Sequence, residues 1–167
     1  VHSTFVVLKD TALTSAGLFS VLIGAQVFSN FINLAGLPEA LIAMVTAYEV
    51  EPFIVILMIL GIYIILGCVF ESLSMLLLTV PIFFPLVTSL GYDAIWFGIV
   101  VVVVTEISLI TPPVGLNVFI LRGVVNDVTT GTIFRGVTPF WIADIFRLAL
   151  IVLVPIIVLY LPNQMGA

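Results

Sequence analysis

The feature that most constrains this chain is the length of its uncharged apolar runs. The stretch Trp96–Thr105 holds no charged residue, and Val50–Phe70 holds only Glu51. Across the 167 residues, 63% are hydrophobic and 8% are charged, and the mean hydropathy is +1.43. A soluble domain has roughly half apolar and a quarter charged residues, so lipid must be the solvent for much of this chain. The sequence therefore predicts an all-α polytopic membrane protein in a lipid bilayer.

The scarcity of basic residues and cysteine, and the absence of several motifs, argue against some classes of function. Four Lys plus Arg are too few for a nucleic-acid partner. The single cysteine, Cys68, offers neither a disulfide nor a cysteine-based metal site, and we interpret it as a small core residue. No phosphate-binding glycine loop, zinc spacing or serine nucleophile elbow is present, so we expect no enzyme activity and no organic cofactor. Residues 1–10 do not resemble a signal peptide, which favours an internal fragment or a separated half.

The first half of the chain predicts one spanning helix followed by a hairpin. Residues 11–34 are long enough, at about 1.5 Å per residue, to cross a hydrocarbon core of roughly 30 Å. A short amphipathic or re-entrant segment follows over residues 37–48. The apolar run then resumes over residues 53–89, with the polar stretch 71–74 inside it. Its second arm, Met75–Ser89, would span only about 22 Å as a helix, which predicts a re-entrant helical hairpin that enters and leaves on one face.

A broken helix is predicted over residues 94–126. Two apolar stretches there are separated by Thr111, Pro112 and Pro113. The two prolines remove two backbone donors and disfavour helix at the residue before them, so Thr111 is expected at an unwound joint.

The end of the chain predicts a polar loop over residues 126–136 and a last helix over residues 137–161. Trp141 and Tyr160 are expected near opposite membrane interfaces, where aromatic side chains are enriched. The basic residues are expected on the cytoplasmic side and the acidic residues of the loops on the other. These are Lys9, Arg122, Arg135 and Arg147 against Glu39, Glu49, Glu51 and Asp93.

Two polar kinks, at residues 67–74 and 108–117, are the candidate functional site. Non-helical backbone at membrane depth frees carbonyl oxygens for a cation, and the N-terminus of the following half-helix attracts an anion. Sodium accepts such oxygen ligands without rigid geometry. The candidate sodium ligands are the backbone carbonyls around Gly67, Ser108 and Val114 and the Thr111 hydroxyl. The candidate substrate and kink residues are Glu71, Ser72, Ser74, Pro112, Pro113, Gly115 and Asn117. The alternative is that Pro112 and Pro113 form only a structural kink.

Other polar residues near these kinks have two interpretations each. An ionisable residue in a membrane segment is a functional candidate, which applies to Glu71 and Glu106. Glu71 alternatively caps the second hairpin arm or lies at its wetted tip, and Glu106 alternatively pairs with a basic or hydroxyl group. Near the end of the first helix, packing through interhelical hydrogen bonds is favoured over contact with solute. That group consists of Gln26, Ser29, Asn30 and Asn33.

Three stretches carry a resemblance to a known family. They are the run from Gly67 through Pro81 and Pro85 to residues 91–98, the segment 106–117, and the segment 136–140. Together they resemble the C-terminal region of the large membrane subunit of TRAP transporters, a DctM-like permease. The likeness extends over essentially the whole chain.

The resemblance implies a sodium-coupled symporter in the bacterial cytoplasmic (inner) membrane that imports organic acids without ATP. C4-dicarboxylates and sialic acid are the implied types of substrate. A periplasmic solute-binding protein would deliver the substrate to the large subunit and a small four-helix membrane subunit. The implied fold is one repeat of an inverted-repeat elevator-type transporter, which requires the remaining N-terminal half of the large subunit.

The resemblance also implies roles for parts of this chain. Gly67, Ser108, Thr111 and Val114 would line one sodium site, mainly through main-chain oxygens, although family members often have glycine where Ser108 stands. Residues 1–51 would be a scaffold helix with its connecting segment, residues 52–126 the transport half, and residues 127–167 a loop and a C-terminal scaffold helix.

Three alternatives stay open at this point. The first is a related sodium-coupled carrier of dicarboxylates or other anions that works without a binding protein. The second is a channel or a purely structural membrane subunit, for which the proline break would matter to assembly rather than to sodium-coupled flux. An intramembrane enzyme is the third.

Overall fold

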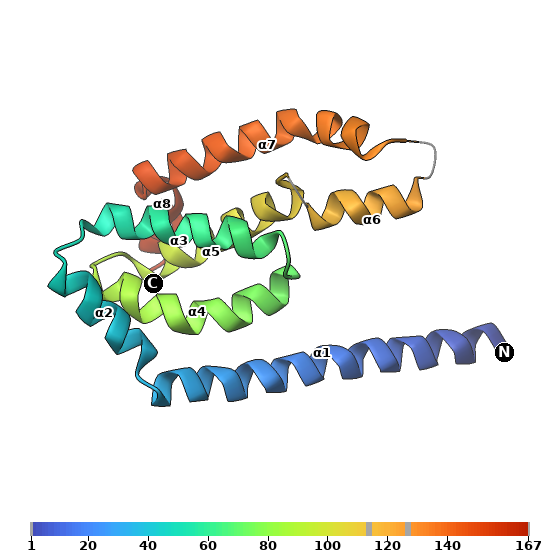
Figure 1. The fold of residues 1–167 in the computed structure, drawn as a ribbon, viewed down its shortest axis with the longest axis horizontal. Coiled ribbons are helices and arrows are strands. Elements are labelled where there is room, and N and C mark those ends of the chain that lie inside the picture. The colour runs from blue at the N-terminus through green and yellow to red at the C-terminus, as the bar shows by residue number, and fades with distance from the viewer. Residues whose placement is uncertain (1, 113–114, 126–127, 167) are drawn as a thin grey trace.

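The computed structural model describes residues 2–112, 115–125 and 128–166. Within them the chain forms eight helices (Figure 1). The bounds are α1 His2–Leu34, α2 Leu37–Ala47, α3 Pro52–Gly67, α4 Ser72–Ser89, α5 Ala94–Ile110, α6 Leu116–Val124, α7 Thr130–Leu153 and α8 Ile156–Gln164. The all-α expectation is thus confirmed for the described residues.

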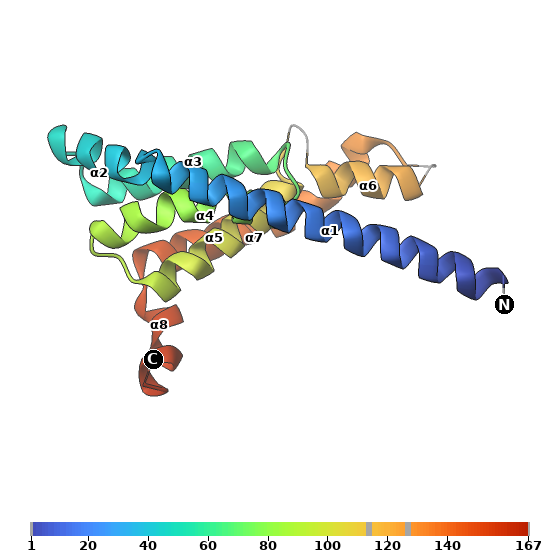
Figure 2. The same ribbon diagram turned by 90° about the horizontal axis from the view of Figure 1, so that it is seen from below.

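The helices pack side by side around α5. Figure 1 shows α3 and α4 as an antiparallel hairpin, with α2 crossing one end to link them to the long α1. α1 packs against α4, and α5 packs against α3, α4 and α7. The core lies where these helices meet, with Tyr63, Val87, Trp96 and Val104 buried completely or nearly so. α8 leaves the bundle at a steep angle (Figure 2).

Three helices are long and apolar enough to cross a membrane. They cover Thr4–Leu34, Ser72–Ser89 and Thr130–Leu153. Large apolar side chains such as Phe19, Phe140 and Phe146 are exposed along them, which matches a lipid or protein environment rather than water. The described residues are therefore consistent with a polytopic membrane protein, as predicted from the apolar runs.

The predicted hairpin over residues 53–89 corresponds to α3 and α4. At 1.5 Å per residue α3 is about 24 Å long, short of a hydrocarbon core of roughly 30 Å, whereas α4 begins at Ser72, is about 27 Å long and meets the length of a membrane span. Pro81 and Pro85 lie inside α4 and do not end it. Whether the hairpin enters and leaves on one membrane face stays a prediction.

The last helix differs from the prediction at both ends. The polar residues expected as a loop over 126–136 instead begin α7 at Thr130, because Thr129 caps the helix by accepting a hydrogen bond from the Thr132 N–H. The helix stops at Leu153, well before residue 161. Pro155 has no N–H for the carbonyl of Ile151, so the chain turns and restarts as α8.

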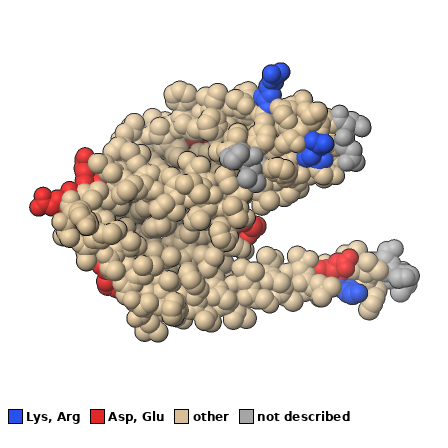
Figure 3. Space-filling model, viewed as in Figure 1, with Lys and Arg blue, Asp and Glu red and all other residues tan. Residues whose placement is uncertain are grey.

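The charged residues separate along the bundle much as predicted. Figure 3 shows acidic side chains gathered at the α2 end and Lys and Arg toward the opposite end, where α1 begins and α6 meets α7, but acidic side chains also lie beside the basic one at the start of α1 and between the two ends. Arg147 lies within α7, about 18 Å along the helix from Arg135, and pairs with Asp144 at 3.0 Å. Along α7, Arg147 is therefore separated from the basic side chain near the start of the helix, and the membrane face of each stays a prediction.

Candidate functional site

The candidate site is the break between α5 and α6. α5 ends at Ile110, and Thr111 has an extended backbone (φ −79°, ψ 131°). Pro112 lacks the N–H that would bond the Ser108 carbonyl in a continuing helix, and the Thr111 N–H donates to that carbonyl at 3.2 Å instead. Thr111 therefore lies at the predicted unwound joint.

Gly115 precedes α6 in a left-handed conformation with φ 57°. A Cβ at this position would lie 3.3 Å from both the Thr111 carbonyl oxygen and a ring carbon of Phe134. Glycine is thus required by its backbone angle and by its close neighbours. Pro113 and Val114, which were predicted to contribute to the site, lie outside the described residues.

The tip of the hairpin contacts the break directly. Gly67 ends α3, and a Cβ placed on it would overlap the Cβ and Oγ of Ser108 on α5. Ser108 itself is completely buried. The two kinks that the sequence singled out therefore meet, and a glycine at position 67 permits the approach.

The two hydroxyl groups at the break both donate their protons to main-chain carbonyls of α5. Ser108 Oγ donates to the Thr105 carbonyl at 2.6 Å, and Thr111 Oγ1 donates to the Ile107 carbonyl at 2.6 Å. A hydroxyl has one proton and two lone pairs, so both oxygens present only lone pairs to other groups. Such an arrangement suits a cation better than an anion.

A contact that the sequence prediction missed comes from α7. Trp141 Nε1 donates to Thr111 Oγ1 at 2.8 Å, and the side chain is half-buried. The indole N–H of Trp141 therefore bonds within the protein, and its position near a membrane interface stays a prediction. The signal for this contact was weak, because any indole N–H in an apolar helix needs a partner but does not indicate which one.

Glu71 caps the second arm of the hairpin, which confirms one of the alternatives that the sequence left open for this residue. Its carboxylate accepts hydrogen bonds from the main-chain N–H groups of Leu73 at 3.0 Å and Ser74 at 3.1 Å, and from both serine hydroxyls at 3.2 Å. The Leu73 N–H, more than any other group, lowers the pKa of Glu71 below its ordinary value, with burial acting against it. Glu71, Ser72 and Ser74 thus form one local cluster at the tip.

Other predicted residues lie apart from this cluster. Asn117 and Pro112 are exposed at the break, and Glu106 is exposed on α5. Among the described residues the only ion pair joins Arg147 and Asp144, so no basic partner for Glu106 is found there.

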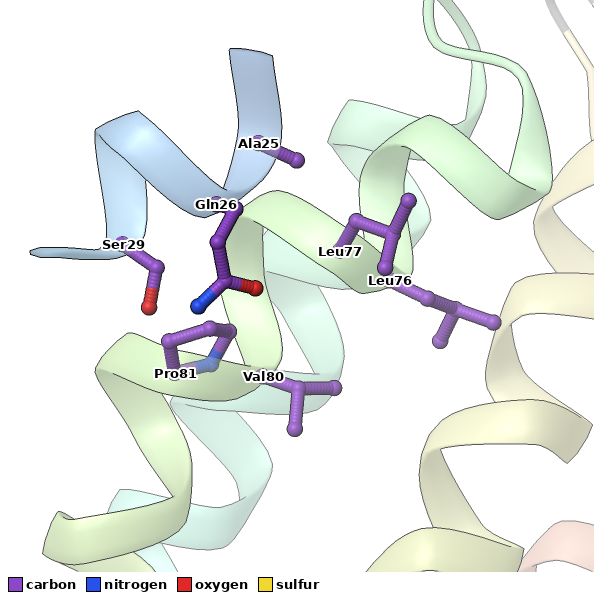
Figure 4. Close-up of a pocket in the computed structure, with 7 residues that line it drawn as sticks. All are labelled: Ala25, Gln26, Ser29, Leu76, Leu77, Val80 and Pro81. Atoms are coloured by element: carbon purple, nitrogen blue, oxygen red, sulfur yellow. The ribbon is translucent and has the colours of Figure 1, made fainter. Parts of the chain in front are cut away.

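The polar residues of α1 face α4 across a cavity of about 290 Å³ (Figure 4). Figure 4 shows the Gln26 amide directed toward Pro81, with Ser29 beside it. Pro81 has no N–H to bond the Leu77 carbonyl, so this part of α4 is relatively polar. Asn30 and Asn33 are exposed. α1 packs against α4 here, but Gln26 and Ser29 form no interhelical hydrogen bond among the described residues, so the packing role favoured for them stays a prediction.

Comparison with known proteins identifies relatives along nearly the whole chain. A family profile described as "Tripartite ATP-independent periplasmic transporter, DctM component" matches residues 1–157. The "C4-dicarboxylate TRAP transporter large permease protein DctM" of Pseudomonas aeruginosa is 32% identical over 160 residues, which is 96% of this chain and 37% of that protein. The "Sialic acid TRAP transporter large permease protein SiaM" of Vibrio cholerae is 31% identical over 157 residues, or 94% of this chain and 36% of that protein.

A third relative matches a shorter part of this chain. The "Isethionate TRAP transporter permease protein DctMQ" of Oleidesulfovibrio alaskensis is 32% identical over 117 residues, which cover 70% of this chain and 18% of that protein. This chain spans little more than a third of the length of the first two relatives.

Proposed function

Because the chain belongs to the DctM-component family of tripartite ATP-independent periplasmic transporters, we propose that it forms part of the ion-coupled core of a sodium-driven importer of organic acids. Its relatives are transporter permeases and not enzymes, which fits the expectation that this chain performs no covalent chemistry. The activity proposed here is that of the complete permease.

The observation that carries the proposal is the meeting of the hairpin tip and the helix break at Gly67 and Ser108. There, hydroxyl protons point back into α5, and proline leaves the last carbonyls of α5 without their usual donors. Sodium would be held by main-chain oxygens around Gly67, Ser108 and Val114 and by the Thr111 hydroxyl. Hard cations accept such oxygen ligands.

The proposed solute is an organic acid. The names of the relatives refer to C4-dicarboxylates, sialic acid and isethionate, and all of these compounds carry acidic groups. We assign the solute to the side of the break where Gly115 and Asn117 begin α6, because the N-terminus of a helix favours an anion. Glu71, Ser72 and Ser74 would shape the hairpin tip beside it.

The proposed assembly follows the family. A small four-helix membrane subunit, a periplasmic solute-binding protein and the rest of the large subunit would complete the transporter in the cytoplasmic membrane. Residues 52–126 would move as the transport half in an elevator mechanism, with residues 1–51 in the scaffold. The sequence assigned residues 127–167 to the scaffold as well, but two indole hydrogen bonds join α7 to α5, so we propose that α7 moves with the transport half.

The test is uptake by the complete transporter, reconstituted in vesicles with its small subunit and binding protein. Uptake of a C4-dicarboxylate, sialic acid and isethionate would be measured under an imposed sodium gradient. Thr111→Ala should weaken sodium-driven uptake. Thr46→Ala is the matched control, because Thr46 makes the same hydroxyl bond to a carbonyl four residues earlier but is exposed on α2.

The possible results of this uptake experiment distinguish the proposed importer from the alternative functions. Uptake that requires both sodium and the binding protein supports the proposal, and loss in the Thr111 variant supports the site. Sodium-driven uptake without the binding protein would indicate the receptor-independent anion carrier. Uptake indifferent to sodium would overturn the sodium-coupled proposal.

A further inference from the structure

We propose that Trp141 is a positioning residue for the ion site, because its indole N–H holds the Thr111 hydroxyl with one lone pair directed at the break. This inference rests on the proposed function, in which Thr111 is a sodium ligand. It adds a residue from α7 to a site otherwise built from the hairpin and the broken helix.

The hydrogen bonds of Thr111 leave little freedom to its side chain. Oγ1 donates to the Ile107 carbonyl at 2.6 Å and accepts from Trp141 Nε1 at 2.8 Å, and the residue is 7% exposed. The Thr111 N–H is bonded to the Ser108 carbonyl, so it does not compete with the hydroxyl for the Ile107 carbonyl. The proton and one lone pair are thus committed, and one lone pair is left.

The two bonds together determine where that last lone pair points. With the bond to Ile107 alone, both lone pairs of the Thr111 hydroxyl oxygen would be free to accept a hydrogen bond from any donor or from water. The indole occupies one of the two acceptor positions and so selects the other for the ion. An oxygen oriented in advance loses less freedom when a cation binds, which strengthens binding.

The indole ring of Trp141 packs against the buried core on one side and borders a cavity on another. A cavity of about 250 Å³ lies beside the ring, between the end of α5 and α7. Its lining residues are Ile110, Pro112, Phe134, Val137, Thr138 and Trp141. Phe134 lies two helical turns before Trp141 on α7 and contacts the neighbourhood of Gly115. One face of α7 therefore meets the break at two points, and the polar one is Trp141.

The experiment measures the sodium dependence of uptake in the complete reconstituted transporter. Trp141→Phe keeps an aromatic ring but removes the donor. The sodium concentration for half-maximal uptake is expected to rise about three- to ten-fold, the effect of losing one buried hydrogen bond, with the maximal rate nearly unchanged. Combined with Thr111→Val, the same change should have no further effect on sodium dependence, because the acceptor is already gone.

Trp96→Phe is the matched control. Trp96 also donates its indole N–H between α5 and α7, but to the Ile151 carbonyl at the end far from the break. It should alter the amount of folded protein and leave the half-maximal sodium concentration unchanged. If Trp141→Phe fails to reach the membrane, benzothienylalanine at position 141 replaces the N–H by sulfur and retains the ring shape.

The outcomes distinguish this inference from the proposed function. Wild-type uptake that ignores sodium overturns both. Sodium-driven wild-type uptake with unchanged sodium dependence in both Trp141 variants overturns the positioning role alone. A lower half-maximal sodium concentration would also contradict it, since the indole would then compete with sodium for the oxygen.

Discussion

The indole Nε1 of Trp96 donates a 2.9 Å hydrogen bond to the main-chain oxygen of Ile151. That oxygen is free because residue 155 is a proline, which provides no N–H four positions later. The bond ties the first turn of α5 to the last turn of α7, and Trp141, near the middle of α7, ties that helix to the end of α5. α5 and α7 are thus joined antiparallel by two indole groups.

Trp96→Phe is expected to destabilise the protein by about 1–3 kcal/mol, because the buried Ile151 carbonyl loses the indole donor that it has in the described part of the chain. Adding Pro155→Ala should recover part of this loss, since alanine supplies an N–H to the same carbonyl. Thermal unfolding in detergent measures both variants. If the double variant were no more stable than Trp96→Phe, the freed carbonyl would not be the cause.

Gly67→Ala should destabilise the hairpin contact by about 1–3 kcal/mol, because the new methyl group overlaps Ser108. Ser108→Gly removes the obstacle and should rescue stability in the double variant. Gly61→Ala, on the same helix with open space around its Cβ, is the control and should not destabilise. Rescue would be read from thermal unfolding and from sodium-driven uptake, and a double variant as weak as Gly67→Ala would argue against this contact.

Glu71→Ala should cost about 1 kcal/mol of stability through loss of the cap on α4. Glu106→Ala, which removes an exposed carboxylate on α5, is the control. The pKa of Glu71 is lowered in the folded protein, so its stabilising contribution is present above the ordinary pKa of a glutamate and is lost as pH falls through the lowered value. Unfolding measured across acidic pH should show this loss in the wild type and not in Glu71→Ala.

Gly115→Ala should impair sodium-driven uptake more than Gly36→Ala. Both glycines have positive φ, 57° and 71°, so each substitution carries backbone strain of roughly 1–2 kcal/mol. Only the Cβ at position 115 would also press on the Thr111 carbonyl and Phe134. Equal losses of uptake at equal protein levels would show that backbone strain alone explains the effect.

The local pattern of the sequence was sufficient for most of the helices. Apolar runs and proline positions predicted the hairpin over α3 and α4 and the joint at Thr111, because these depend on hydrophobic length and on missing N–H groups in neighbouring residues. The same reasoning placed the last helix incorrectly. The bounds of α7 are instead set by the Thr129 cap at its start and by Pro155, which ends its hydrogen-bond pattern, and both are local features of the sequence.

By itself, therefore, the sequence determined that the chain is an apolar α-helical protein with two polar kinks, since solvent preference and backbone donors are properties of each short segment. Only the tertiary structure decided that Gly67 lies against Ser108, that Trp141 bonds Thr111 and that Glu71 is engaged as a cap. The first two contacts join helices far apart in the chain. Their partners are selected by how whole helices pack, which no local pattern of residues specifies.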